Sequence, residues 1–115
     1  MELFRHPLRV STEQDTAAVG LAPSKEQILV LQKALGRAVR KYRHRLGLTQ
    51  ESASERADLH RTYLADVERG ARNASIGSIV KVANALEVSV SDLFKAAEGE
   101  MATDKASKFP ESRSD

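Results

Sequence analysis

The stretch TQESASERADLHRTYLADVERG, residues 49–70, decides the fold of this 115-residue chain. Thr49 is a typical helix cap, and a short helix is predicted over 50–57. After a tight turn, a second helix is predicted over about 61–69, and Gly70 ends it because glycine readily adopts the left-handed conformation. Two short helices joined by a tight turn are typical of proteins that place one helix across the major groove of DNA.

The second of these helices has an apolar side and a polar side. Leu64 and Val67 must point to the core, which places on the opposite side the set Arg61, Thr62, Ala65 and Asp66. Arginine can bond the O6 and N7 atoms of guanine, threonine can contact bases through its hydroxyl or methyl group, and aspartate can accept from the cytosine amine. On the helix alone, solvated surface charges explain this face at least as well. The preceding helix and turn favour base reading by Arg61, Thr62 and Asp66.

An amphipathic helical pattern also precedes the central stretch. Apolar residues recur at helical steps over 28–46, and Ser24 with Gln27 forms a capping-box pattern ahead of them. The segment is predicted either as one long helix or as a leading turn followed by a helix from about Lys33. A break is an alternative because Gly36 costs a helix roughly 1 kcal/mol relative to alanine.

Two more helices are predicted after the loop at 71–74. One covers 76–86 with Ser75 as its cap, and a short one holds Leu93 and Phe94. The expected fold is therefore all-α, a compact five-helix bundle with a helix-turn-helix. The predicted divisions are a flexible arm over 1–23, a candidate helical extension over 24–34, the domain over 35–96 and a disordered tail over 97–115.

Composition narrows the classes of protein. The chain is 41% hydrophobic with a net charge of +2, and it has no cysteine, which excludes a disulfide framework and a cysteine-based zinc site. No apolar run approaches a membrane span and the first residues lack the apolar centre of a signal peptide, so a cytoplasmic protein without membrane association is expected. The window 33–45 holds six basic residues and no acid, a mild indication of a polyanionic partner, although most of these are expected to be solvated. No metal, cofactor or enzyme activity is expected, since nucleophile and phosphate-loop motifs are absent and no metal spacing connects the histidines His6, His44 and His60.

From about Leu35 to Phe94 the chain resembles the helix-turn-helix domain of the Cro and phage-repressor type, the XRE family with its lambda-repressor-like fold. The matching stretches are, in order, LGRAVRKYRHRLGLTQESAS, HRTYLADVERGARNASI and VANALEVSVSDLF. Within them, HRTYLADVERG is similar to the recognition helix of restriction–modification controller proteins. The resemblance implies a transcriptional regulator that binds specific sequences in double-stranded DNA. It also implies a homodimer whose half-sites lie about one helical turn, roughly 34 Å, apart.

The resemblance also implies residue roles. It assigns base reading to Arg61, Thr62 and Asp66, and it assigns contacts with the DNA backbone to the set Gln50, Tyr63, Arg72 and Asn73. His60 stands where the family usually has a serine or threonine cap, and it is expected either to loosen the first turn or to contact a phosphate. Arg43 and Glu68 match a charged pair that ties the first helix to the third.

The sequence departs from the family pattern at several positions. Ala53 stands where leucine is common, and Asp58 and Glu87 stand where glycine is common, which suggests a domain of modest stability. The apolar end around Leu93 is expected either to close the monomer core or to form the dimer seam, and the extension over 24–34 is a further candidate for that seam.

An alternative function is an antitoxin or partner-binding module that autoregulates its own operon. In that case the N-terminal arm, residues 1 to 30, would fold on a protein partner.

Overall fold

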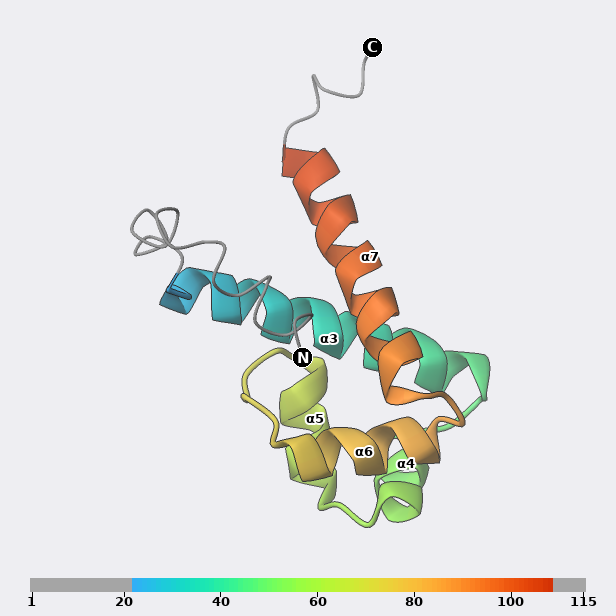
Figure 1. Cartoon of the computed structure of the whole chain (residues 1–115). Helices are drawn as coiled ribbons and strands as arrows, with labels where there is room; N and C mark the ends of the chain where they lie inside the picture. The colour runs from blue at the N-terminus through green and yellow to red at the C-terminus, as the bar shows by residue number, and fades with distance from the viewer. Residues whose placement is uncertain (1–21, 109–115) are drawn as a thin grey trace, which may run out of the picture.

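The structure, a computed structural model, describes residues 22–108. Its helices are α3 (Lys25–Arg45), α4 (Gln50–Ala57), α5 (Arg61–Glu68), α6 (Ile76–Ala85) and α7 (Val90–Lys108). No strand occurs over these residues, so the predicted all-α five-helix fold is confirmed for them. Helices α4, α5 and α6 lie together on one side of α3, and α7 crosses α3 and rises away from them (Figure 1). Nearly all of the predicted arm and the last part of the predicted tail fall outside the described residues.

Helix α3 is one uninterrupted helix of 21 residues. Ser24 caps it by accepting a hydrogen bond from the backbone nitrogen of Gln27 at 3.0 Å, and the Gln27 side chain accepts in return from the Ser24 nitrogen at 3.1 Å. The alternative break near Gly36 does not occur. A Cβ at Gly36 would overlap the carbonyl oxygens of Val67 and Glu68, so glycine is needed where α3 and α5 touch.

The helix-turn-helix is built from local capping interactions. Thr49 accepts from the Ser52 nitrogen at 2.9 Å, and the Ser52 hydroxyl accepts from the Thr49 nitrogen at 3.0 Å. Asp58 ends α4 with φ 57° and ψ 47°, the left-handed conformation that glycine usually supplies. Because this residue turns the chain sharply, α5 can begin as close as Arg61.

Similar caps define the last two helices. The Ser75 hydroxyl accepts from the Ser78 nitrogen at 3.1 Å at the start of α6. Glu87 follows α6 with φ 63°, again in the left-handed region. The Ser89 hydroxyl then accepts from the Asp92 nitrogen at 2.9 Å at the start of α7.

Helix α7 is longer than predicted. It continues to Lys108, so the prediction of a disordered tail is not met over 97–108. Ala97 is fully buried and Met101 packs against the core, which supports the helix beyond its first two turns. Glu100 also ties α7 to α3, since it pairs with Lys41 at 2.5 Å and with Arg37 at 3.2 Å. These ion pairs hold the pKa of Glu100 below its ordinary value, with Lys41 as the larger cause.

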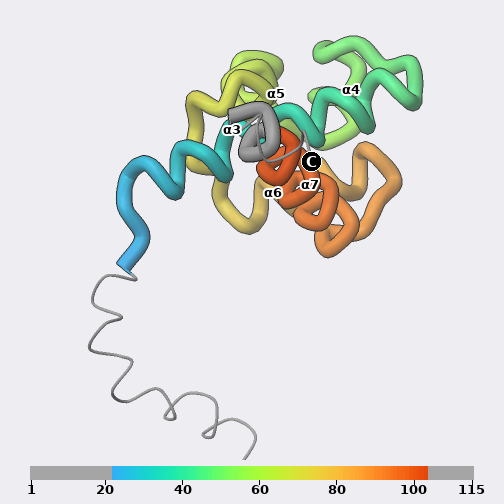
Figure 2. The backbone as a smooth tube through the Cα atoms, turned by 90° about the horizontal axis from the view of Figure 1, so that it is seen from above, coloured from blue at the N-terminus to red at the C-terminus, as the bar shows by residue number. Residues whose placement is uncertain are grey.

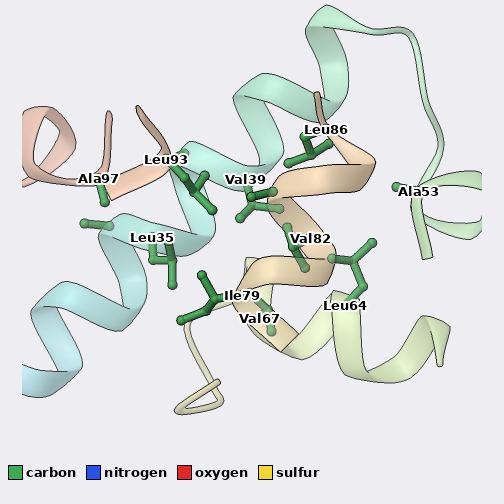
Figure 3. Packing of buried hydrophobic residues seen from close by; sticks show 13 residues of the cluster. Leu35, Val39, Ala53, Leu64, Val67, Ile79, Val82, Leu86, Leu93 and Ala97 are labelled. Atoms are coloured by element: carbon green, nitrogen blue, oxygen red, sulfur yellow. The ribbon is translucent and has the colours of Figure 1, made fainter. Parts of the chain in front are cut away.

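The core lies where α3, α5, α6 and α7 meet (Figure 3). Its largest fully buried side chains are Leu64, Leu93 and Val39. The apolar end predicted around Leu93 therefore closes the monomer, whereas Val90 on the same helix stays 36% exposed. Within residues 22–108, no helix is both long enough and apolar enough to pass through a lipid bilayer.

The N-terminal half of α3 projects beyond the other helices (Figure 2). It carries four consecutive exposed apolar residues, Ile28, Leu29, Val30 and Leu31, each between 37% and 44% exposed. Ile28, Val30 and Leu31 line an open cleft of about 680 Å³ whose other wall includes Met101 of α7.

Candidate nucleic-acid interface

Helix α5 is fixed by one face and exposes the other. Leu64 and Val67 are 1% and 4% exposed and lie in the core. Arg61 and Thr62, two of the predicted base-reading residues, are exposed in the first turn of the helix. Ala65 is partly exposed, and its small side chain leaves room for close approach to this face. The arrangement therefore presents an arginine and a hydroxyl on a rigid support.

Glu68 locks α5 to its two neighbours. Its carboxylate receives two hydrogen bonds from the Arg43 guanidinium, Nε to Oε2 at 2.6 Å and Nη2 to Oε1 at 2.8 Å. Arg43 also donates from Nη1 to the Leu48 carbonyl oxygen at 3.0 Å. The charged pair that the family resemblance implied is present, and it joins α3 to α5. The Glu68 hydrogen bond raises the pKa of Arg43, so both partners stay charged.

Gln50, a predicted DNA-backbone contact, takes part in the same network. Its side-chain nitrogen donates to Glu68 Oε1 at 2.9 Å, which joins α4 to α5. Burial raises the pKa of Glu68, but hydrogen bonds from Arg43 and Gln50 lower it further, so the net pKa lies below its ordinary value. In the free protein Gln50 therefore orients the two helices of the helix-turn-helix, and its role toward DNA stays a prediction.

His60 serves as the cap of α5. Its Nδ1 atom accepts from the Thr62 nitrogen at 3.3 Å, so the ring replaces the serine or threonine hydroxyl at this position. The residue is exposed, and Nε2, the other ring nitrogen, has no hydrogen-bond partner among the described residues. The structure thus favours capping over the expected loosening of the first turn, and the predicted phosphate contact would fall to Nε2.

Asp66, the third predicted base-reading residue, is occupied by two arginines. Oδ1 accepts from Arg69, and Oδ2 accepts from Arg72 Nη2 at 3.2 Å. The carboxylate is only 19% exposed. The hydrogen bond from Arg69, with that from Arg72, holds the pKa of Asp66 below its ordinary value, so the group is charged at neutral pH. Asp66 differs in this respect from Arg61 and Thr62.

Tyr63 and Arg72, both predicted to reach the DNA backbone, contact each other. The guanidinium carbon of Arg72 lies 4.5 Å from the centre of the Tyr63 ring, a cation–π geometry. The Tyr63 hydroxyl accepts from the Ser75 nitrogen at 3.4 Å. Burial raises the pKa of Tyr63, but hydrogen bonds with Ser78 and Ser75 bring it below its ordinary value. Tyr63 therefore attaches the segment after α5 to the helix, in addition to the hydrogen bond between Arg72 and Asp66.

The remaining predicted contact, Asn73, is exposed in that loop. It borders an apolar hollow of about 270 Å³ that lies between the loop and α3. Nearby, Gln32 of α3 donates to the Gly70 carbonyl oxygen at 3.1 Å, which fixes the end of α5. The structure therefore brings all the predicted DNA contacts after residue 59 onto α5, its cap and the loop that follows.

Several basic residues of α3 are engaged within the protein. Arg37 and Lys41 pair with Glu100, and Arg40 lies 3.6 Å from Glu68. Arg45 lies over the Tyr42 ring at 4.8 Å. These contacts support the interpretation of the basic run as a structural and solvated face. Arg69, the residue that caps the end of α5, pairs with Asp66 and was not among the predicted site residues. Among residues 22–108, no three side chains of the metal-binding types come together as a site.

Comparison with known proteins gives one consistent group of relatives. A family model described as helix-turn-helix matches residues 39–93. Control protein C.BamHI of Bacillus amyloliquefaciens is 44% identical over 59 residues, which make up 50% of this chain and 73% of that protein. Control protein C.SmaI of Serratia marcescens is 40% identical over 63 residues, 55% of this chain and 75% of that protein.

The similar solved structures are also those of regulatory proteins. The clp gene regulator ClgR from Corynebacterium glutamicum superposes with a TM-score of 0.66 and 35% identity, covering 68% of this chain and 83% of that one. The restriction–modification controller protein C.Esp1396I, solved as a tetramer with its natural 35 base-pair operator, superposes with a TM-score of 0.59 and 32% identity. That match covers 63% of this chain and 95% of the controller chain. The fold and the order of its helices are therefore shared with proteins that are about one third identical.

Proposed function

The chain belongs to the XRE-type helix-turn-helix family of DNA-binding transcriptional regulators, and on this premise we propose that it recognises one operator sequence through the exposed face of α5. Arg61 and Thr62 would contact base edges in the major groove, where arginine pairs with guanine and threonine packs on thymine or bonds a base. Contacts from Gln50, His60, Tyr63, Arg72 and Asn73 to phosphates would set the register.

One observation supports this proposal most directly. Glu68 is held from the core side by Arg43 and Gln50, while Arg61 and Thr62 on the same short helix stay exposed. A helix anchored in this way can enter a groove without losing its own packing. It also loses little conformational freedom on binding, because its backbone is already fixed by the core.

We further propose that the protein binds DNA as a homodimer. The similar protein C.Esp1396I also binds its operator as an assembly of several copies, a tetramer. The projecting half of α3 is the surface that we assign to the seam. Ile28 to Leu31 are exposed apolar residues that together cover nearly the whole circumference of one turn of α3, and an apolar helix surface of this kind is normally buried. In a two-fold arrangement, the projecting helix of each copy would fill the cleft between α3 and Met101 of the other.

The function is tested by selecting binding sites from random DNA duplexes with the full chain. Enrichment of a motif with two related half-sites is expected, and a reporter gene placed behind that motif should respond to the protein. Selection that enriches no motif, at salt concentrations where the protein stays folded, would reject operator recognition.

The seam is tested by replacing Leu29 and Leu31 with lysine and measuring molar mass in solution. We expect monomers and a loss of cooperative binding to the two half-sites, whereas Val80→Lys on α6, which is also exposed, should leave the dimer intact. A dimer that survives the first change but not the second would move the seam to α6.

The antitoxin alternative is not favoured, because the relatives above are control proteins and gene regulators. Its partner-binding arm also lies mostly outside the described residues. We place the regulator in the cytoplasm with the DNA it would bind, and we propose no catalytic role for it.

A further inference from the structure

We propose that Asp66 is a positioning and specificity-determining residue, which holds Arg72 for a phosphate contact and restrains the attraction of Arg69 and Arg72 for DNA of any sequence. This inference rests on the proposed function and changes the predicted role of Asp66 from reading a base to controlling two arginines. Three features of the polar face support this role: both oxygens of the Asp66 carboxylate are bonded, the Arg72 guanidinium is held from two directions, and Asp66 offsets part of the positive charge of the two arginines.

The carboxylate of Asp66 is already used on both oxygens. Arg69 donates to Oδ1 and Arg72 donates to Oδ2 at 3.2 Å, and the side chain is only 19% exposed. A carboxylate that approaches DNA without a partner is repelled by the phosphates. Here two guanidinium groups offset that repulsion, and exchanging them for one cytosine amine would leave both arginines without this partner.

Arg72 is clamped from two directions. Its guanidinium stacks over the Tyr63 ring at 4.5 Å and is bonded at one edge by Asp66. Arginine has five N–H donors, and the bond to Asp66 uses one of them, so several remain for a phosphate. The Tyr63 hydroxyl in turn accepts from the Ser75 nitrogen, so the ring that stacks on Arg72 is itself fixed in position. Arg72 therefore gives up much of its side-chain freedom before DNA arrives.

The charge balance sets apart specific and non-specific binding. Asp66 offsets about one of the two positive charges that Arg69 and Arg72 bring to the face. Non-specific affinity grows with the number of phosphates neutralised and depends little on their exact geometry. The complex with the operator depends on a phosphate lying where the clamped Arg72 presents its free donors. Removing the carboxylate should therefore strengthen non-specific binding. It should also lower the preference for the operator, because Arg72 would no longer be held in the position that fits one phosphate.

The experiment compares the full chain with its Asp66→Asn variant on the selected operator and on a shuffled duplex of equal length, over a series of salt concentrations. We expect affinity for the shuffled duplex to rise, its log–log salt slope to steepen by about 0.9, the increment for one phosphate, and the specificity ratio to fall about tenfold. The motif selected by Asp66→Asn should be unchanged at every position.

Three further comparisons isolate the mechanism. Glu87→Gln removes a carboxylate that lies away from α5 and is paired with Arg56 at 3.2 Å. This control variant should leave the specificity ratio unchanged. Asp66→Glu keeps the charge and should restore much of the ratio. In an Arg72→Gln background, Asp66→Asn should cause no further loss of operator affinity, because the effect on positioning acts through Arg72.

Each contrary result has its own meaning. A selected motif that changes at one base pair in Asp66→Asn would overturn the inference in favour of base reading. Equal weakening on operator and shuffled duplex would overturn it in favour of a merely structural role. An unchanged ratio, with the parent chain still binding its operator selectively, would reject the inference and leave the proposed function standing. A parent chain without any sequence preference would reject both.

Discussion

Gly36 of α3 lies directly against the end of α5, where a Cβ would come within 2.8 Å of the carbonyl carbon of Glu68. We expect Gly36→Ala to lower the free energy of unfolding by roughly 1–3 kcal/mol, because the overlap outweighs the better helix propensity of alanine. Urea denaturation measures the change. Gly99 of α7 is the matched control, since nothing lies within 4 Å of its Cβ position, and Gly99→Ala should stabilise by about 0.5–1 kcal/mol. Equal behaviour of the two variants would contradict the close contact.

Removal of the Glu68 charge should destabilise the domain strongly. The carboxylate is fully buried and compensates Arg43, so Glu68→Gln leaves a buried cation without its partner and should cost on the order of 3 kcal/mol. Chemical denaturation at neutral pH gives the value. The control is Glu98→Gln on the exposed side of α7, which should change stability by less than about 0.5 kcal/mol.

The same carboxylate predicts a pH dependence. The folded pKa of Glu68 lies below its ordinary value of 4.5, so its stabilisation is complete above pH 4.5 and is lost as the pH falls through the lower folded pKa. Unfolding free energies measured across the acid range should therefore fall less steeply in Glu68→Gln than in the parent chain. Parallel curves for the two proteins would show that Glu68 is not held charged by its partners.

Arg61 should carry discrimination at one base-pair position. Arg61→Ala is expected to weaken operator binding by roughly 1–3 kcal/mol and to relax the selected motif at a single position, since a paired contact with guanine would be lost. Binding titrations and a repeated site selection measure both effects. Lys95→Ala, an exposed cation on α7, should alter neither. If Arg61→Ala selects the original motif with the original affinity, the assigned face is wrong.

Two left-handed residues offer stabilising substitutions. Glu87 has φ 63° and Asp58 has φ 57°, and a side chain in this region costs roughly 1–2 kcal/mol, less for aspartate. Glu87→Gly should raise the unfolding free energy by about 0.5 kcal/mol or more, after allowance for the exposed ion pair with Arg56. Asp58→Gly should raise the unfolding free energy by a smaller amount. Thermal melting checks the order, and the reverse exchange Gly47→Ala, at φ 70°, should destabilise.

The caps at the starts of α3, α4 and α6 could be read from the sequence because capping is local. Ser24, Thr49 and Ser75 each bond the backbone nitrogen three residues ahead, a relationship that neighbouring letters reveal. The continuity of α3 could not be predicted from the sequence. Gly36 is needed there to make room for the end of α5, which lies more than thirty residues further along the chain. A glycine that weakens a helix and one that admits a neighbour look identical in the sequence.

The length of α7 and the ion pairs of Asp66 show the same difference between features set by nearby residues and features set by distant ones. Leu93, Ala97 and Met101 are spaced by four, a helical signal that the polar composition of the tail obscured. On α5, the exposure of Arg61 and Thr62 followed from periodicity alone. The pairing of Asp66 with Arg72 did not, because Arg72 lies beyond the helix and returns to it only through the loop.

Glu68 is buried at the last residue of α5 and Arg61 is exposed in its first turn, and this separation has an evolutionary consequence. The residues that hold the helix and the residues that would choose the operator can change independently. Duplicated genes for such a domain can therefore diverge in target sequence by a few substitutions on the outer face without first acquiring compensating changes in the core. Closely related regulators in one cell can in this way become insulated from each other's operators while keeping the same scaffold.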